Sequence, residues 1–229
     1  MERLSVIVPV LNETARIGAA LDALAPLRQR GHEVIVVDGG SHDGTADLAR
    51  IRADKVLASL RGRAVQMNAG AAAASGDVLL FLHADTLLPA GADEAIAQGL
   101  ASTGREWGRF DVRIDGRSAW LPVVAGLMNL RSRATGIATG DQAMFVRRAA
   151  FERAGGFPPL EIMEDIALSA RLKRISRPVC LRDTAITSGR RWDERGAMRT
   201  IGLMWWLRLR FFVGDAPARL ARTYDGKRG

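Results

Sequence analysis

The chain has 229 residues, of which 48% are hydrophobic and 25% are charged, and its formal net charge at pH 7 is +8. This composition excludes an intrinsically disordered protein, because the apolar side chains suffice for the core of one α/β domain. A single cysteine and three histidines also exclude a disulfide framework and a Cys/His zinc cluster, so we expect a reducing, cytoplasmic location.

Two features argue against a secreted or membrane-spanning protein. The N-terminal residues lack the basic, apolar and small-residue regions of a signal peptide. The longest apolar runs, residues 121–128 and 201–207, are far shorter than the roughly 18 residues that a spanning helix needs. We therefore expect neither a secretion signal nor an integral membrane segment.

The positive charge is concentrated near the C-terminus. Residues 186–229 contain 10 basic and 4 acidic side chains, whereas residues 1–185 contain 23 and 21. Of the 33 basic residues 30 are arginine, which suits bidentate recognition of phosphate and equally suits a genome rich in arginine codons. No nucleic-acid-binding module is recognisable, so we predict no nucleic-acid partner. We divide the chain into a domain over 1–185 and a basic, aromatic helical tail over 186–229.

The first hundred residues alternate between predicted strands and helices. Apolar, β-branched runs predict buried strands over 4–10, 33–38, 55–58 and 77–83. Between the first two, helical spacing predicts a helix that ends near Gly31, with Asn12 or Thr14 as its N-cap. Further helices are expected up to Ala49 and over the small residues 62–74. This alternation predicts an α/β fold with a doubly wound, mainly parallel sheet and helices on both faces.

The second half is less regular. The pattern predicts strands over 107–114 and 142–147, and helices over 119–133, 164–174 and 196–213. The last is an amphipathic helix that contains Trp205, Trp206, Arg208 and Arg210. Tryptophan and arginine together are typical of a helix in a membrane interface, but a helix that packs on the domain or on a second subunit would bury the same aromatic side chains. We prefer packing.

Polar side chains gather where the first, second and fourth predicted strands end. They are Asn12, Glu13, Asp38, Asp43, His83 and Asp85. Because the carboxyl ends of parallel strands meet at one edge of a sheet, we expect these groups to form a single site. Each alone is as well explained as a helix or turn cap, whereas the set favours ligand binding.

The loops around these strand ends suit a ligand with phosphate groups. Gly39, Gly40 and Gly44 permit close approach of the backbone, and Arg61 and Arg63 stand where they could clamp a diphosphate. Neither the dinucleotide fingerprint G-x-G-x-x-G after a strand nor the P-loop pattern occurs, which argues against a dehydrogenase and a P-loop NTPase.

Three segments carry a more specific signal: SVIVPVLNE at 5–13, VVDGGSHDGT at 36–45 and FLHADT at 81–86. In order and spacing they resemble the nucleotide-sugar motifs of the family-two glycosyltransferases, which have the GT-A fold. Glu164-Asp165, preceded by Gly155-Gly156-Phe157, resembles the later acidic pair of that family. Residues 61–70 and 188–192 look like those of a short, soluble bacterial subgroup.

The resemblance implies roles for individual residues. Pro9, Asn12 and Glu13 would surround the nucleoside, Asp38 would accept hydrogen bonds from the base, and Asp85 would bind Mn²⁺ or Mg²⁺ bridging the diphosphate. The complete donor-binding set that it implies is Pro9, Asn12, Glu13, Asp38, Gly40, Asp43, Arg63, His83, Ala84 and Asp85.

His83 departs from the family, whose metal motif usually has two acids separated by one residue. His83 stands in place of the first acid, two residues before Asp85. An imidazole ligand would suit Mn²⁺ better than Mg²⁺; the other interpretation, which we prefer, is a core residue at the end of a strand.

The acidic pair suits glycosyl transfer with inversion, which needs a general base on the acceptor side and a Lewis acid for the leaving diphosphate. The resemblance assigns the base to Asp165, with Glu164 orienting it or contacting the acceptor. The competing interpretation is two acids that stabilise a helix N-terminus. Further substrate contacts are expected from two segments, the first near the acceptor and the second over the diphosphate: Gly140, Asp141 and Gln142, then Arg190, Arg191 and Trp192.

We therefore predict a metal-dependent, inverting glycosyltransferase that uses a nucleotide-diphosphate sugar. One alternative is a sugar-phosphate nucleotidyltransferase, but residues 9–13 occupy the place of its glycine-rich loop. Another is a non-catalytic sugar-nucleotide-binding or membrane-surface adaptor, which His83 favours and the retained acids Asp85, Glu164 and Asp165 oppose. The donor base and sugar, the acceptor, a homodimer and contact with the inner face of a membrane stay open.

Overall fold

The computed structural model describes residues 2–215 and 217–224, with some side chains of the last three helices left aside. The strands are β1 (Leu4–Val10), β2 (Glu33–Asp38), β3 (Lys55–Ala58), β4 (Val78–Phe81), β5 (Thr86–Leu87), β6 (Trp107–Asp115), β7 (Phe145–Arg147) and β8 (Val179–Ser188). The helices are α1 (Thr14–Gln29), α2 (Thr45–Arg50), α3 (Arg63–Ala73), α4 (Ala92–Thr103), α5 (Leu121–Thr135), the 3₁₀ turn η1 (Gly140–Gln142), α6 (Arg148–Arg153), α7 (Glu164–Leu172), α8 (Arg190–Arg195), α9 (Ala197–Phe212) and α10 (Pro217–Tyr224).

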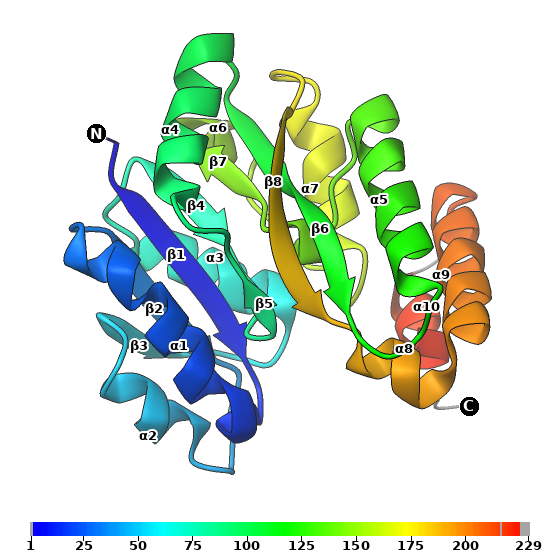
Figure 1. Ribbon diagram of the computed structural model, residues 1–229, viewed down its shortest axis with the longest axis horizontal. Coiled ribbons are helices and arrows are strands. Elements are labelled where there is room, and N and C mark those ends of the chain that lie inside the picture. Colours follow the sequence, from blue (N-terminus) through cyan, green and yellow to red (C-terminus); the bar gives the residue numbers. More distant parts are fainter. Residues whose placement is uncertain (1, 216, 225–229) are drawn as a thin grey trace.

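One sheet of eight strands, in the order β3-β2-β1-β4-β7-β6-β8-β5, runs through the described part of the chain (Figure 1). Strand β1 pairs in parallel with β2 and β4, and β2 pairs in parallel with β3. Beyond β4 the sheet is mixed, because β7 is antiparallel to both β4 and β6. The α/β fold predicted from the sequence is confirmed, with its parallel pairing concentrated in the first half.

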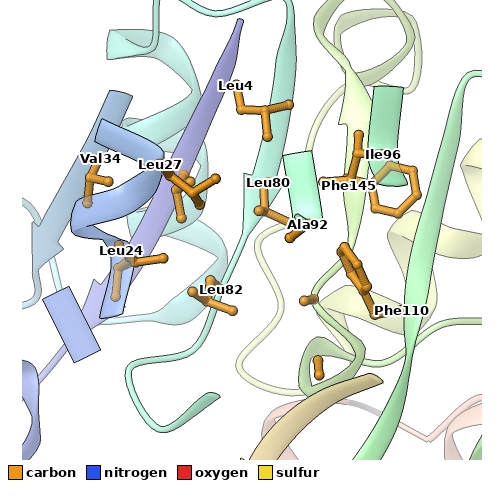
Figure 2. Close-up of a cluster of buried hydrophobic side chains, with 14 of the residues drawn as sticks. Leu4, Leu24, Leu27, Val34, Leu80, Leu82, Ala92, Ile96, Phe110 and Phe145 are labelled. Atoms are coloured by element: carbon orange, nitrogen blue, oxygen red, sulfur yellow. The ribbon is translucent and has the colours of Figure 1, made fainter. Parts of the chain in front are cut away.

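The central strands are buried on both faces, which explains their continuous apolar sequences. Successive side chains of a strand point to opposite faces. Val6 and Val8 accordingly belong to a core cluster beneath α1 and α4, whereas Ile7 belongs to a second cluster beneath α3. Figure 2 shows part of the first cluster, in which Leu24 of α1 and Ile96 of α4 lie on the same side of the sheet as Leu80.

Helix α3 packs close to the sheet through its small residues, as the sequence of 62–74 suggested. A Cβ atom added to Gly70 would lie 2.4 Å from Cγ2 of Ile7 and 3.0 Å from Cγ2 of Val37. Because neither β-branched side chain can withdraw from a packed core, only glycine permits this distance between helix and sheet.

Several elements of the structure were not predicted. Helices α4, α6, α8 and α10, strands β5 and β8 and the η1 turn have no counterpart among the expected elements. The strand expected over 77–83 ends at Phe81, so His83 lies in the following turn. The predicted N-cap is also wrong: Glu13 occupies that position and Asn12 has a left-handed φ of 54°. An exposed acid from another loop, Asp43, accepts the hydrogen bond of the Thr14 amide instead.

The tail begins inside the sheet, because β8 crosses the expected boundary at residue 185. Within it, Leu207 of α9 and Leu220 of α10 pack against two residues at the start of α7. These are Met163, which precedes the helix, and Ile166 in its first turn. In this structure one face of the C-terminal helix therefore packs on the domain. None of the helices in the described ranges combines the length and apolarity required to cross a bilayer.

The close packing of α3 leads to a stability prediction. Gly70→Ala should lower the free energy of unfolding by about 1–3 kcal/mol, because its methyl group overlaps Ile7. Gly126→Ala in α5 is a matched control, since a Cβ there meets nothing within 4 Å, and should raise the stability by up to about 1 kcal/mol through helix propensity. Urea unfolding of both variants tests this, and equal stabilities would contradict the packing.

Candidate active site

The loops after β1 and β2 are joined by hydrogen bonds. The Asn12 amide donates to the Ser41 hydroxyl at 2.8 Å, and the Asn12 side-chain oxygen accepts from the His42 amide at 3.0 Å. The Glu13 amide donates to the Thr45 hydroxyl at 2.8 Å. The two loops therefore form one rigid rim at the carboxyl ends of these strands.

Asp43 lies at the centre of this junction. Its two oxygens accept from the Thr14 and Thr45 amides, each at 3.1 Å, and from the Thr45 hydroxyl. These bonds, that of the hydroxyl above all, lower the pKa of Asp43. In the structure Asp43 thus acts as the cap that the sequence allowed as an alternative to ligand binding.

Asp38 closes the turn that follows β2. It is 7% exposed and accepts from the Gly40 amide at 3.1 Å, the Ser41 amide at 3.0 Å and the Ser41 hydroxyl. Gly40 has a φ of 93°, which a residue with a side chain rarely adopts. Contact between Asp38 and a nucleotide base stays a prediction. The carboxylate could still accept such a hydrogen bond, because these three bonds do not use all of its lone pairs.

A buried amide that the sequence analysis missed ties the first two strands to α3. Gln66 donates from Nε2 to the carbonyl oxygens of Val10 and Val37, both at 2.8 Å. Its side chain lies against Gly39, where a Cβ would be 3.1 Å away. Gln66 therefore fixes the start of α3, with Arg61 and Arg63 exposed beside it, relative to the rim.

The loop after β4 supplies the third part of the rim. His83 is half-buried and packs on η1, where a Cβ at Gly140 would lie 2.5 Å from its ring. Its Nδ1 lies 3.5 Å from a carboxylate oxygen of Asp141. Ala84 is buried, and the chain then turns outward at Asp85. His83 thus joins the donor rim to the segment expected to meet the acceptor.

Asp85 presents an exposed carboxylate that makes no hydrogen bond or ion pair within the described ranges, while its carbonyl accepts from Ser188. Among residues 2–215 and 217–224, no group of three or more His, Cys, Asp and Glu side chains is placed to hold a metal ion. A single hard oxygen ligand fits a cation that takes its remaining ligands from phosphate and water. The residues present are consistent with that mode of binding.

The acidic pair begins α7, directly after Met163, whose φ is 65°. Asp165 accepts from the Gly140 amide and from its own helix at Ile166, both at 2.7 Å. Asp165 is half-buried, whereas Glu164 is only 4% exposed. The pair therefore differs in environment: one carboxylate is oriented by η1 and the other points into the core.

Burial raises the pKa of Glu164 from 4.5 to about 7, and the negative charge of Asp165 adds to the rise. The positive charge of Arg63 and His83 opposes it. The side chain lines an apolar cavity of about 10 Å³, enough for one water molecule. Its lining residues are Met67, Phe81, His83, Gly140, Met144, Phe157, Glu164 and Asp165.

This cavity brings together predicted residues from three distant segments: His83, Gly140 and the pair Glu164-Asp165. Sequence reasoning missed its apolar wall. Asn68 helps to build that wall, since it donates to the carbonyl of Phe157 at 2.8 Å and accepts from its amide at 2.9 Å. The signal for this pair was present, because both Asn68 and Phe157 lie in segments that carried the family resemblance.

Two predicted substrate contacts serve packing in this structure. Gln142 is fully buried and donates to Ser132 of α5 at 3.1 Å, so of the η1 segment Gly140 and Asp141 are left to face a ligand. Trp192 packs against the apolar cluster between β6 and α5. Arg190 is exposed at the start of α8, and the side chain of Arg191 is outside the described part of the structure.

Comparison with protein families identifies this arrangement. Residues 5–155, which include the three rim loops and η1, match the model of glycosyl transferase family 2. The chain belongs to this family. The matched residues cover about two thirds of the chain, from the first strand to Gly155.

Two curated relatives match this chain over part of their length. A glycosyltransferase of PGL/p-HBAD biosynthesis from Mycobacterium bovis is 40% identical over 91 residues, which cover 37% of this chain and 36% of the relative. The undecaprenyl-phosphate 4-deoxy-4-formamido-L-arabinose transferase of Aeromonas hydrophila is 30% identical over 164 residues, covering 62% and 47%. The matches thus span between a third and a half of these relatives.

Solved structures agree with the fold. A mannosyltransferase from Pyrobaculum calidifontis, solved with GDP-Man and Mn²⁺, superimposes with a TM-score of 0.61 at 26% identity, covering 81% of this chain and 56% of the other. The TarS protein of S. aureus, solved with UDP, gives 0.67 at 22% identity, covering 81% and 60%. These neighbours confirm that the chain has the GT-A fold.

The buried acid predicts a pH-dependent stability. A folded-state pKa near 7, against 4.5 in the unfolded chain, means that the folded protein binds this proton more tightly, so stability falls as pH rises from about 4.5 to 7. Glu164→Gln removes the titration. Between pH 4 and pH 8 the free energy of unfolding of this variant should rise, relative to that of wild type, by on the order of 2–3 kcal/mol.

Urea unfolding across this pH range measures the effect, with Glu161→Gln as the control because Glu161 is exposed three residues away. Parallel stability curves for wild type and Glu164→Gln would show that Glu164 is not held neutral by burial.

Proposed function

We propose that this chain transfers a sugar from a nucleotide-diphosphate sugar to a nucleophilic acceptor, with inversion at the anomeric carbon. The observation that carries the proposal is the meeting of Glu164-Asp165 with His83 and Gly140 around one cavity at the edge where the rim loops end. Family membership over residues 5–155 supports the same chemistry.

The donor would lie on the rim formed by the loops after β1 and β2. Pro9, Asn12, Glu13 and Asp38 would face its nucleoside, and the exposed Arg61 and Arg63 would face its diphosphate. The related mannosyltransferase was solved with GDP-Man, and a TarS structure with UDP-GlcNAc. Both are nucleotide-diphosphate sugars, which supports this donor class and leaves its base and sugar open.

A divalent cation, Mn²⁺ or Mg²⁺, would be held by Asp85 and would supply positive charge to the leaving diphosphate when bound. The carboxylate of Asp85 is exposed and has no hydrogen-bond or ion-pair partner among the residues that the structure describes, which supports this role. Arg63 at the rim and Arg190 in α8 would place further positive charge beside the diphosphate and so stabilise it as it leaves.

Asp165 would act as the general base. The Gly140 amide orients its carboxylate, and each oxygen keeps a lone pair for a further hydrogen bond. As the acceptor oxygen forms its bond to the anomeric carbon, the bond from that carbon to the diphosphate oxygen breaks and the acceptor proton passes to Asp165. Glu164 would position Asp165 and place a second acid, largely neutral below pH 7, beside the acceptor.

Asp165→Asn tests the base. It should lower kcat by about 10²–10⁴-fold, since general base catalysis is lost, and change the affinity for the donor nucleotide less than about threefold. Asp47→Asn, at a side chain that is 79% exposed on α2, is the matched control. Steady-state kinetics with calorimetric donor binding separate the two effects. Equal losses of turnover and affinity would exclude Asp165 as the base.

A thermal-shift panel of nucleotide-diphosphate sugars with and without Mn²⁺ tests the donor and the cation. The correct donor should raise the melting temperature. At a donor concentration of 100 Kd, binding adds about 2.7 kcal/mol to the free energy of unfolding. Asp85→Asn should lose the part that depends on Mn²⁺, whereas the exposed control Asp183→Asn should keep it. A panel in which no nucleotide sugar stabilises the chain would contradict the proposed donor class.

A further inference from the structure

Helix α5 has an outward face that is entirely apolar. Trp120, Val123, Leu127 and Leu130 follow at helical spacing and are 53%, 51%, 53% and 64% exposed. The opposite face of the helix, which includes Val124, packs on β6. Isolated exposed leucines are common on proteins, but a continuous row of large apolar side chains on one helix face marks an interaction site.

Helix α9, with Val213 directly after it, also exposes large apolar side chains. Its inner side packs through Leu207, whereas Trp205, Trp206, Leu209 and Val213 are 64%, 45%, 62% and 74% exposed. In Figure 1 both helices lie at the end of the molecule beyond β6 and β8. These eight exposed side chains of α5 and α9 are called here the α5/α9 face.

Arginine predominates among the charged residues of the two segments that carry the α5/α9 face. Residues 116–135 and 197–213 together contain six arginines and no aspartate or glutamate. The Arg210 guanidinium lies 5.5 Å from the ring centre of Trp206 and pairs with Asp215. Arg133 pairs with Asp111, and the Arg117 side chain, 90% exposed, lies 3.9 Å from a carboxylate oxygen of Asp193. Exposed tryptophan and leucine side chains bordered by arginine suit a partner that has a negatively charged outer layer and an apolar layer below it.

We propose that the α5/α9 face docks on a membrane surface rich in anionic lipid. Its tryptophans and leucines would enter the headgroup region while the arginines contact lipid phosphates. A second copy of the chain is a poorer occupant, because a twofold interface would set the same arginine-rich segments against each other. The inference does not require the proposed activity, since it concerns binding alone.

The two helices also support the candidate active site. Leu207 of α9 packs on Met163 and Ile166, the residues on either side of the acidic pair. Ser132 of α5 accepts a hydrogen bond from Gln142 in η1. Docking through these helices would therefore place the acceptor side of the site on the part of the molecule attached to the membrane.

Vesicle cosedimentation of the full chain tests the proposal, with phosphatidylcholine vesicles compared with vesicles that also contain phosphatidylglycerol. We expect binding to the anionic vesicles that weakens as salt rises. Leu127→Gln/Leu130→Gln in α5, and separately Trp205→Gln/Leu209→Gln in α9, should each weaken it by about tenfold or more. Ile51→Gln is the matched control, because Ile51 is 75% exposed outside the face, and it should bind like wild type.

Thermal unfolding of the variants checks that they fold, and quenching of tryptophan fluorescence by brominated lipid gives a second measurement on the unmodified chain. Trp120, Trp205 and Trp206 should be quenched in anionic vesicles. The proposal is overturned if wild type does not bind, if it binds both vesicle types equally, or if the control variant loses as much binding as the two double variants. Self-association abolished by the double variants, without vesicle binding, would assign the face to a second copy. Loss of sugar transfer alone would bear on the active site and not on docking.

Discussion

The parallel pairing of β1 with β2 and β4 is the constraint on which the candidate active site depends. It sends the ends of these strands to one edge, where Asn12, Asp38 and His83 follow in three separate loops. Backbone pairing alone would leave those loops free to move. Hydrogen bonds between the first two loops, and from Gln66 to both strand ends, hold the rim in one geometry. Such preorganisation lowers the cost of ordering when a charged ligand binds.

The acidic pair of α7 shows how neighbouring residues acquire different chemistry. Asp165 is oriented by a backbone amide of η1, while Glu164 is enclosed by aromatic and methionine side chains. Removal of a carboxylate from water is unfavourable, and the nearby charge of Asp165 increases that cost. The structure tolerates it because Arg63 and His83 lie close enough to offset part of it. Strongly shifted pKa values are common at functional sites, which supports the role proposed for this pair.

The C-terminal helices connect the site to the surface of the molecule. Helix α9 uses one face to support α7 and leaves the other in solvent, and α5 divides in the same way between β6 and solvent. The two hypotheses for the C-terminal helix, packing and contact with a surface, are therefore compatible, because they concern opposite faces. The excess of arginine in the segments that carry both outward faces favours a partner of negative charge.

Much of the first half of the fold could be predicted from the sequence. The bounds of β1, β2 and β3 agree with the predicted strands. Strands β1 and β2 are buried on both faces and are therefore apolar almost throughout. Strand β8 could not be predicted in this way. Its residues are partly exposed, and it forms by pairing with β6 about 70 residues earlier, so no local pattern marks it.

The sequence by itself determined the family, the order of the central elements and the acids available for chemistry, because these depend on residue types and short spacings. Only the tertiary structure decided what surrounds each acid. Asp43 became a cap for α1, Glu164 a buried acid with a raised pKa and Asp85 an exposed ligand candidate. Hydrogen-bond partners and burial come from residues far apart in the chain, and these environments fix the energy of each charge.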